Sequence, residues 1–304
     1  MFDFYITYEY WFAAVQLGLA MLGMGATLQL RDFAAVFLRP RALLIGTAVQ
    51  LLCVPLVVWA LLAIFSPVAG LAVGLALCAA IPGGTMSNVF TFLARGHVAL
   101  SIALTSVTTL ACLLTTPIIL GLLIAEHMPP GFVMPAGQIA IEISLILLLP
   151  LMLGMLFLYL RPRWAPVFAR SCIRGSVFII VLIVIGASGA GRIDMEKFGL
   201  ANLTVVLLLV LLLPLVSWFV PRLLGLDRPD STAINIEATV RNGNLGLLIK
   251  ASLFPAVVGE VDPLGDMVLF AVLIYGGLAL LVGVAQIYLH GYFNKREQSA
   301  APAG

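Results

Sequence analysis

Residues 81–88 read Ile-Pro-Gly-Gly-Thr-Met-Ser-Asn and interrupt an apolar run that extends from about 69 to 94. Proline lacks a backbone donor and glycine has little helical preference, so this stretch ends one helix and begins another. A second polar stretch, Glu-Ala-Thr-Val-Arg-Asn-Gly-Asn at residues 237–244, interrupts the apolar run from about 231 to 254. Either stretch alone fits a kinked helix. Two of them, in corresponding halves of one chain, indicate a paired site.

The composition around these stretches is that of a polytopic membrane protein. The 304 residues are 62% hydrophobic and 10% charged, with a mean hydropathy of +1.15. Soluble domains carry roughly 25% charged residues, so this chain has too little polar surface and must face a lipid bilayer. A net charge of +2 without a basic face indicates no nucleic-acid partner. The four cysteines show no CxxC spacing and fit buried small hydrophobic residues.

Nine segments are apolar over the length of about 20 residues that a bilayer-crossing helix needs. They cover approximately 9–29, 41–64, 69–94, 97–125, 137–159, 172–190, 200–224, 231–254 and 266–291. Short loops join them, so we expect an all-α protein with one transmembrane domain over residues 1–304. Segments one to four and six to nine are offset by five, an odd number. Residues 9–125 and 172–291 are therefore expected to be inverted repeats, in which the two interrupted helices cross.

The positions of Lys and Arg predict the orientation. With the N-terminus outside, the outer loops contain only Arg192 and Lys197, and the inner loops contain twelve cations. These twelve are Arg31, Arg39, Arg41, Arg95, Arg161, Arg163, Arg170, Arg174, Arg222, Arg228, Lys295 and Arg296. This bias follows the positive-inside rule and predicts an outer N-terminus and a cytoplasmic C-terminus. The expected location is a cell membrane, in a bacterium the inner membrane.

Two charged residues fall inside the second interrupted helix. A charge at the centre of a bilayer costs at least about 2.5 kcal/mol and marks a functional site by default. Arg241 follows Glu237 by four residues, so the two could form an internal ion pair if that turn stays helical. Glu142 and Lys250 lie near the outer ends of their segments, where snorkelling towards the interface explains both.

Several short strings carry a resemblance to a known family. They are Gly-Met-Gly-Ala-Thr-Leu at 23–28, Pro-Gly-Gly-Thr-Met-Ser-Asn-Val at 82–89, Phe-Leu-Ala-Arg-Gly at 92–96, Ala-Leu-Ser-Ile-Ala-Leu-Thr-Ser at 99–106, and Ile-Glu at 236–237 with Asn242. On these residues the chain resembles the bile acid:sodium symporter family, in its nine-helix form. The resemblance implies a core of spans 41–125 and 200–291 and a panel of spans 9–29 and 137–190, which rock against each other.

The resemblance also implies a sodium site. Its side chains match Ser87, Asn88, Ser101, Thr105 and Glu237. Sodium is a hard cation and prefers oxygen ligands, as calcium and magnesium do. Ser101 and Thr105 are four residues apart and share one helix face. Their alternative role is to donate hydrogen bonds to the helix carbonyls four residues earlier.

A second sodium of the family uses positions that match Gln50, Glu237, the backbone of Ala238 and Val240, and a glutamine. This chain has Arg241 at the glutamine position, and a guanidinium has five donors and no acceptor. Gln50 and Arg241 are therefore interpreted as the remnant of a second site, with the guanidinium in the role of the ion. We expect at most one coupled sodium.

The function expected from these observations is secondary active transport of a small organic anion with sodium as the coupling ion, without a cofactor. The half-helix N-termini suit a carboxylate, and by the resemblance Thr85 and Asn242 lie nearest the anion. A proton-coupled or uncoupled carrier on the same fold is the alternative. No span contains the HExxH pattern of an intramembrane metalloprotease, and no ring of charges indicates a channel.

Overall fold

The computed structural model describes residues 2–29, 40–128 and 133–300, with side chains described as far as residue 295. Within these ranges all the regular elements are helices. They are α1 (Phe2–Gly25), α3 (Pro40–Ala48), η2 (Val49–Cys53), α4 (Val54–Phe65), α5 (Ala69–Ala80), α6 (Thr85–Leu93), α7 (Val98–Ile124), η3 (Ala125–His127), α8 (Ala136–Glu142), η4 (Ile143–Leu148), α9 (Leu149–Leu160), α10 (Ala165–Gly189), α11 (Met195–Leu223), α12 (Arg228–Thr239), α13 (Gly243–Leu253) and α14 (Pro263–Ala300).

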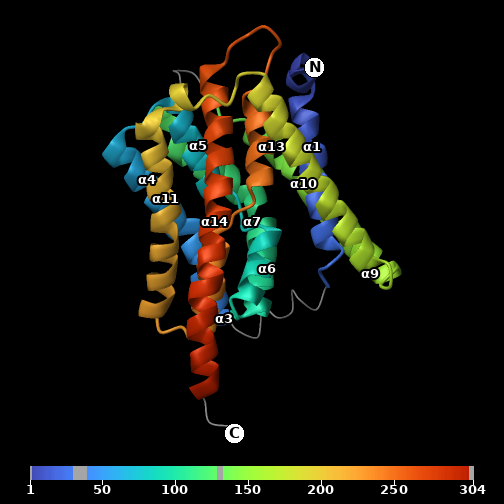
Figure 1. Ribbon diagram of the computed structural model, residues 1–304, viewed down its shortest axis with the longest axis vertical. Helices are drawn as coiled ribbons and strands as arrows, with labels where there is room; N and C mark the ends of the chain where they lie inside the picture. The colour runs from blue at the N-terminus through green and yellow to red at the C-terminus, as the bar shows by residue number, and fades with distance from the viewer. Residues whose placement is uncertain (1, 30–39, 129–132, 301–304) are drawn as a thin grey trace.

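In the described part of the chain, six helical stretches are long and apolar enough to cross a membrane. They are Pro40–Phe65, Val98–His127, Ala136–Leu160, Ala165–Gly189, Met195–Leu223 and Pro263–Lys295. The chain is therefore an all-helical, multi-pass membrane protein. The helices lie side by side, and α1 begins at the opposite end of the molecule from the end of α14 (Figure 1).

Two of these stretches contain a π-helical segment directly before a proline. The segment η2 precedes Pro55 at the start of α4, and η4 precedes Pro150 at the start of α9. Proline has no backbone N–H and its ring clashes with the carbonyl four residues earlier, so the turn before it widens. The helices continue through both prolines.

Both interrupted helices predicted from the sequence are interrupted in the structure. Helix α5 ends at Ala80 and α6 begins at Thr85, while α12 ends at Thr239 and α13 begins at Gly243. The two interruptions cross, with Gly83 and Arg241 paired as an isolated antiparallel bridge. The Gly84 N–H donates to the Val240 carbonyl at 3.2 Å, and the Asn242 N–H donates to the Pro82 carbonyl at 2.9 Å. Each break thus satisfies some of the backbone groups that the other break frees.

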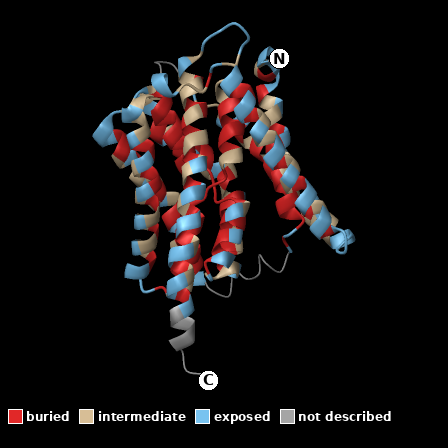
Figure 2. Ribbon diagram, in the orientation of Figure 1, coloured by how far each residue is buried: buried red, intermediate tan, exposed pale blue. Residues whose placement is uncertain are grey.

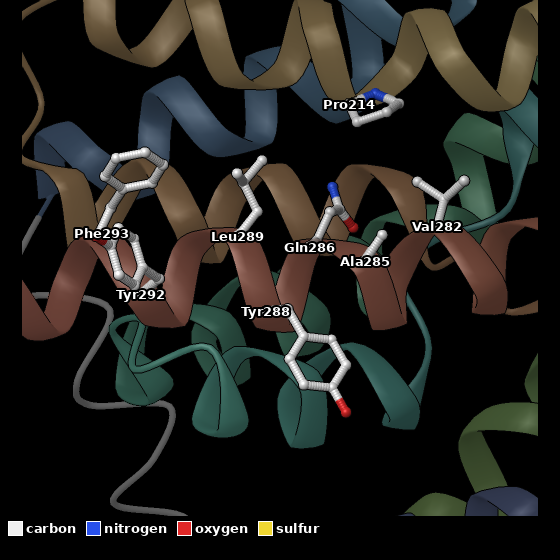
Figure 3. A pocket seen from close by; sticks show the side chains of 8 residues that line it. All are labelled: Pro214, Val282, Ala285, Gln286, Tyr288, Leu289, Tyr292 and Phe293. Carbon is white, nitrogen blue, oxygen red and sulfur yellow. The ribbon is translucent and has the colours of Figure 1, made fainter.

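The helices pack in two groups (Figure 1). Helix α1 packs mainly against α9 and α10, which slant away on one side of the molecule. In the other group, α5 packs on α7 and α14, and α12 packs on α7 and α11. Helix α5 is buried from Gly70 to Ala80 (red in Figure 2). Its Gly70 and Gly74, four residues apart, lie against α14, because small residues let two membrane helices approach closely.

The predicted segments agree with the helices to within about five residues at most bounds. The exceptions are α10, which begins at Ala165 rather than near 172, α14, which ends at Ala300 rather than near 291, and the first segment. Helix α1 begins at Phe2 and ends at Gly25, whereas the sequence predicted a span of about 9–29. Glu9, expected at the edge of the span, lies inside the helix and is buried. Of the cations used to predict orientation, Arg31 and Arg39 lie outside the described residues, as does the side chain of Arg296.

Candidate functional site

Five predicted ligand residues come together beside the crossing. Ser87 and Asn88 lie in the first turn of α6, Ser101 and Thr105 in the first half of α7, and Glu237 in the last turn of α12. The break at Pro82 positions the start of α6 beside the end of α12. The spacing of four residues puts the two α7 hydroxyls on one face. Of the five, only Asn88 is not fully buried.

The carboxylate of Glu237 is the centre of this oxygen cluster. Its Oε2 accepts from Ser87 Oγ at 2.5 Å and from Ser101 Oγ at 3.0 Å, and its Oε1 accepts from Thr105 Oγ1. The Asn88 Oδ1 also lies 2.8 Å from Ser101 Oγ and 3.3 Å from Thr105 Oγ1. Side chains from three helices thus direct their oxygen atoms towards one another.

The cluster has too few protons for its oxygen contacts. Besides the five contacts above, Ser87 Oγ lies 2.5 Å from the Gly84 carbonyl and Thr105 Oγ1 lies 3.0 Å from the Ser101 carbonyl. Each hydroxyl supplies one proton, so three hydroxyls satisfy only three of these contacts at a time. With Asn88 Oδ1 facing the hydroxyls, the others join two acceptor oxygens. A bound cation would convert this repulsion into coordination, so the arrangement is suited to hold one.

Glycine is required at position 83 by this geometry. A Cβ atom on Gly83 would collide with the Glu237 carboxylate, meeting Oε1 first and then Cδ. The Pro-Gly-Gly stretch therefore has two functions. It ends α5, and it lets the backbone of one interrupted helix approach the acidic side chain of the other.

Arg241 does not form the expected ion pair with Glu237. Helix α12 ends at Thr239, so the turn that would bring residues 237 and 241 to one face is absent. Its Nη2 instead donates to the Ala79 carbonyl at 3.2 Å and to the Ile81 carbonyl, at the C-terminal end of α5. Arg241 is 8% exposed, and its Nε and Nη1 have no hydrogen-bond partner among the described residues. A fixed cation therefore lies against the negative end of a half-helix.

Gln50, the other predicted remnant of a second site, lies in the π segment η2 and is fully buried. Neither its Oε1 nor its Nε2 has a hydrogen-bond partner within the described part of the chain. The structure thus does not bring Gln50 into hydrogen-bond contact with Glu237 or Arg241. An unpartnered buried amide is costly.

The two predicted substrate residues lie at the starts of the two half-helices, beside the crossing. Thr85 is the first residue of α6, and Asn242 immediately precedes α13. Asn242 Oδ1 accepts from the Leu245 N–H at 3.4 Å and so caps α13. The N-termini of both half-helices, with their positive dipole ends, lie at the crossing.

Sequence reasoning missed two residues of this region. Thr91 is fully buried and donates to Ser101 Oγ at 3.3 Å. Its signal was its spacing of four from Ser87, which puts both on one face of α6. Tyr275 of α14 donates its hydroxyl to the Thr239 carbonyl at the end of α12, at 2.9 Å. No sequence signal distinguished this tyrosine.

The chemistry of the cluster is that of oxygen ligands alone. Among the described residues, no group of three or more His, Cys, Asp or Glu side chains could hold a metal ion. One full carboxylate, one amide oxygen and three hydroxyls suit a hard monovalent cation better than a transition metal.

Long apolar helices, two crossing half-helix pairs and a buried oxygen cluster define a membrane transporter. Comparison with known proteins agrees. The sequence profile of the sodium bile acid symporter family matches residues 14–193. The chain belongs to this family.

Individual relatives of the chain also have the names of sodium-dependent transporters or sodium cotransporters. An uncharacterized sodium-dependent transporter of Bacillus subtilis is 34% identical over 245 residues, which are 80% of this chain and 74% of that protein. A probable chloroplastic sodium/metabolite cotransporter of rice is 30% identical, over 88% of this chain and 62% of the relative. A sodium-dependent organic anion transporter of cattle is 25% identical, over 93% of this chain and 74% of its own length. The chain thus spans about three fifths of the rice relative.

Proposed function

We propose that this protein is a secondary active transporter that couples the movement of one sodium ion to that of an organic anion. The observation that carries the proposal is the convergence of oxygen atoms in the Glu237 cluster, where seven oxygen contacts of 3.3 Å or less share three hydroxyl protons when Asn88 Oδ1 faces the hydroxyls. A buried carboxylate is stable only when a countercharge or protonation neutralises it. Sodium, at the centre of hydroxyl, amide and carboxylate oxygens, supplies that charge.

Arg241 supports a stoichiometry of at most one sodium. Two unit charges about 4 Å apart repel by roughly 4 kcal/mol at an effective dielectric constant of 20. About 1.4 kcal/mol corresponds to tenfold in affinity, so a second sodium beside the guanidinium loses nearly three decades of binding. The contacts of Arg241 with the α5 carbonyls support its role as a permanent substitute for that ion.

An organic anion is the substrate class that the crossing favours. The N-termini of α6 and α13 offer unsatisfied N–H groups and positive dipole ends there, beside Thr85 and Asn242. The printed names of the cattle and rice relatives, an organic anion transporter and a metabolite cotransporter, support the same class. We assign the anion to the crossing, next to the sodium.

The packing supports a division into two rocking units. The panel consists of α1, α8 to α9 and α10, and the core contains the remaining helices with both interrupted ones. Counting α1, α5–α6 and α12–α13 with the six long stretches gives nine crossings, arranged as inverted repeats over residues 9–125 and 172–291. Alternating access is then a rocking of the core against the panel, in a cell membrane with the N-terminus outside.

Sodium binding can be tested without knowing the substrate. A ligand that binds only the folded state stabilises it, by about 2.7 kcal/mol at one hundred times its dissociation constant. We expect sodium chloride, and not potassium chloride, to raise the unfolding temperature of the purified wild type. Glu237→Gln removes the full countercharge and should abolish this shift. Glu196→Gln, at an exposed carboxylate outside the site, is the matched control and should retain it.

A proton-coupled carrier on the same fold gives a different result. Its unfolding temperature would depend on pH through Glu237 and would not respond to sodium. Equal stabilisation by sodium in the wild type and in Glu237→Gln would place the ion elsewhere and contradict the assignment.

A further inference from the structure

A second buried group of charges lies away from the crossing and has no part in the proposed ion site. Lys250 Nζ donates to both carboxylate oxygens of Glu9, at 2.8 and 2.9 Å. Arg192 Nη1 lies 2.8 Å from the same Glu9, and its Nε donates to Asp266 Oδ1. The Lys250 side chain is 0% exposed and that of Glu9 is 6% exposed. Snorkelling, the sequence-based explanation for Lys250, is therefore wrong.

These four residues come from both groups of helices. Glu9 belongs to α1, in the group of α9 and α10, while Lys250 belongs to α13 and Asp266 to the first turn of α14. Arg192 lies in the loop between α10 and α11 and contacts both carboxylates. The two cations and two carboxylates balance in charge. Because Glu9 is on α1 and Lys250 is on α13, the cluster is complete only while these two helices are in contact. We name these four residues the Glu9 latch.

A second polar contact joins the same two groups nearby. Glu142 Oε1, at the end of α8, accepts from Ser252 Oγ of α13 at 2.7 Å and from Gln138 Nε2 at 3.2 Å. Gln138 also donates to Ser252 Oγ at 2.9 Å. Glu142 is buried, so snorkelling does not describe it either. Helix α13 is thus held at its C-terminal end by α1 and by α8.

The counterpart of α13 in the other interrupted helix is α6, and its surroundings differ. Helix α6 packs on α7, α12 and α14, all in the core group. Its Met86, Val89 and Leu93 are 44%, 46% and 51% exposed, and their spacing puts them on one face. No residue of α13 is exposed. Figure 2 shows this difference as pale blue on α6 against red and tan on α13.

Of the two half-helices, α13 is covered and α6 is partly exposed, which is the asymmetry expected of a carrier that is closed on one side. From the two clusters and this asymmetry, we propose that the Glu9 latch is the gate that closes the side of the molecule on which α1 begins. This inference rests on the alternating access proposed above. When the core rocks away from the panel, Lys250 leaves Glu9 and that side opens, while the panel covers α6.

The test is the accessibility of introduced cysteines in the full-length protein, in a background without the four native ones. Ala251→Cys, adjacent to Lys250 and 2% exposed, reports on the latched side, and Val89→Cys reports on the exposed face of α6. A membrane-impermeant maleimide is applied to intact cells and to inverted vesicles. We expect Val89→Cys to react quickly from the side of α6, and Ala251→Cys to react slowly from the other side.

Adding Glu9→Gln should weaken the latch and shift the carrier towards its other state. The charge left buried without its partner favours opening, so labelling of Ala251→Cys should rise by about tenfold or more. Labelling of Val89→Cys should fall in the same protein. Glu196→Gln makes the same chemical change at an exposed carboxylate near Arg192 and should leave both rates unchanged.

A second variant, in which both charges are removed, allows the same test if Glu9→Gln does not fold. In Glu9→Gln with Lys250→Met no unpaired charge is buried between these two positions, and such replacements are often tolerated. It should also label faster at Ala251→Cys, because the ion pair that holds α13 is gone. Unchanged labelling in both folded variants would overturn the latch. A faster rate without any sodium effect on the unfolding temperature would overturn only the proposed sodium coupling.

Discussion

At the scale of the residue, Gly83 decides whether the oxygen cluster can form. The backbone of one interrupted helix passes so close to the Glu237 carboxylate that no side chain fits between them. Proline and glycine in residues 82–84 were read from the sequence as a helix break, and that prediction is confirmed. The close approach to an acidic group 154 positions later could not be read, because it exists only when the two breaks cross.

Gly83→Ala should therefore displace Glu237 and disrupt cation binding. Overpacking of a buried position typically costs about 1–3 kcal/mol, and the displaced carboxylate would no longer meet all three hydroxyls. The measurement is the unfolding temperature of purified protein with and without sodium, and both the baseline and the sodium-induced rise should fall. Gly121→Ala in α7 is the control, since a Cβ there meets nothing within 4 Å. A full sodium response in Gly83→Ala would show that the ion binds elsewhere.

Arg241→Gln tests the fixed charge at the crossing. The substitution replaces a guanidinium by an amide that can ligate a cation, at the position where the resemblance has a glutamine. We expect the Hill coefficient for sodium to rise from about one to about two, because the repulsion of roughly 4 kcal/mol is removed. A sodium titration of the unfolding temperature or of uptake measures it. A coefficient of two in the wild type would mean that the guanidinium leaves the second site available.

The sequence gives the composition of the cluster but not its connections. The spacing of Ser101 and Thr105, and the break before Ser87, put hydroxyls on suitable faces, and the resemblance named all five candidate ligands. The expected Glu237–Arg241 pair was wrong because a helical turn was assumed where α12 has already ended. Backbone carbonyls at a helix end compete successfully for a guanidinium, and a sequence does not show where such an end lies.

At the scale of the element, the carbonyl groups at the ends of α5 and α12 accept hydrogen bonds from different kinds of donor. The C-terminal carbonyls of α5 accept from Arg241, whereas the end of α12 accepts from the Tyr275 hydroxyl of α14. The last carbonyls of a helix have no partner within it. At membrane depth they need one from elsewhere in the protein. Both helix ends therefore need a hydrogen-bond donor from another part of the protein. The donor is a charged guanidinium at α5 and a neutral phenol at α12, so the half-helices are not interchangeable.

Tyr275→Phe should loosen the end of α12 without changing the shape of the side chain. Leaving a buried acceptor unsatisfied costs about 1–3 kcal/mol, and the Thr239 carbonyl lies two residues after Glu237. We expect a lower unfolding temperature and weaker sodium stabilisation. Tyr288→Phe removes the same atom from an exposed position of α14 and should change stability by less than about 0.5 kcal/mol. Equal effects of the two substitutions would show that the Tyr275 hydrogen bond contributes nothing.

At the scale of the whole molecule, hydropathy predicted the helical architecture well, because a bilayer imposes the length of every span. The predicted segments match helices to within about five residues at most bounds, but α14 ends nine residues late, α10 begins seven residues early, and so does α1. There the apolar pattern suggested a start near residue 9, and a buried ion pair instead brings Glu9 into the helix. Compensation between charges on distant helices is invisible to a count of apolar residues. The same limitation made Lys250 and Glu142 look like interface residues.

The orientation of the whole molecule has its own test. Arg161 lies between α9 and α10, Glu260 lies between α13 and α14, and both are exposed. With the N-terminus outside, an impermeant maleimide should label Glu260→Cys in intact cells and should label Arg161→Cys only after the cells are opened. The positive-inside bias is the physical reason. The reverse pattern would invert the topology.

The fixed guanidinium at the crossing also bears on the energy source for accumulation. One sodium moving with one monovalent anion carries no net charge, so we expect uptake to be electroneutral and independent of membrane voltage. A carrier with two sodium ions would gain about 2.3 kcal/mol per 100 mV, which is roughly fiftyfold in accumulation ratio. By holding a charge of its own where another carrier admits an ion, this protein would concentrate its substrate by the sodium gradient alone. It would thus continue to work in a depolarised cell.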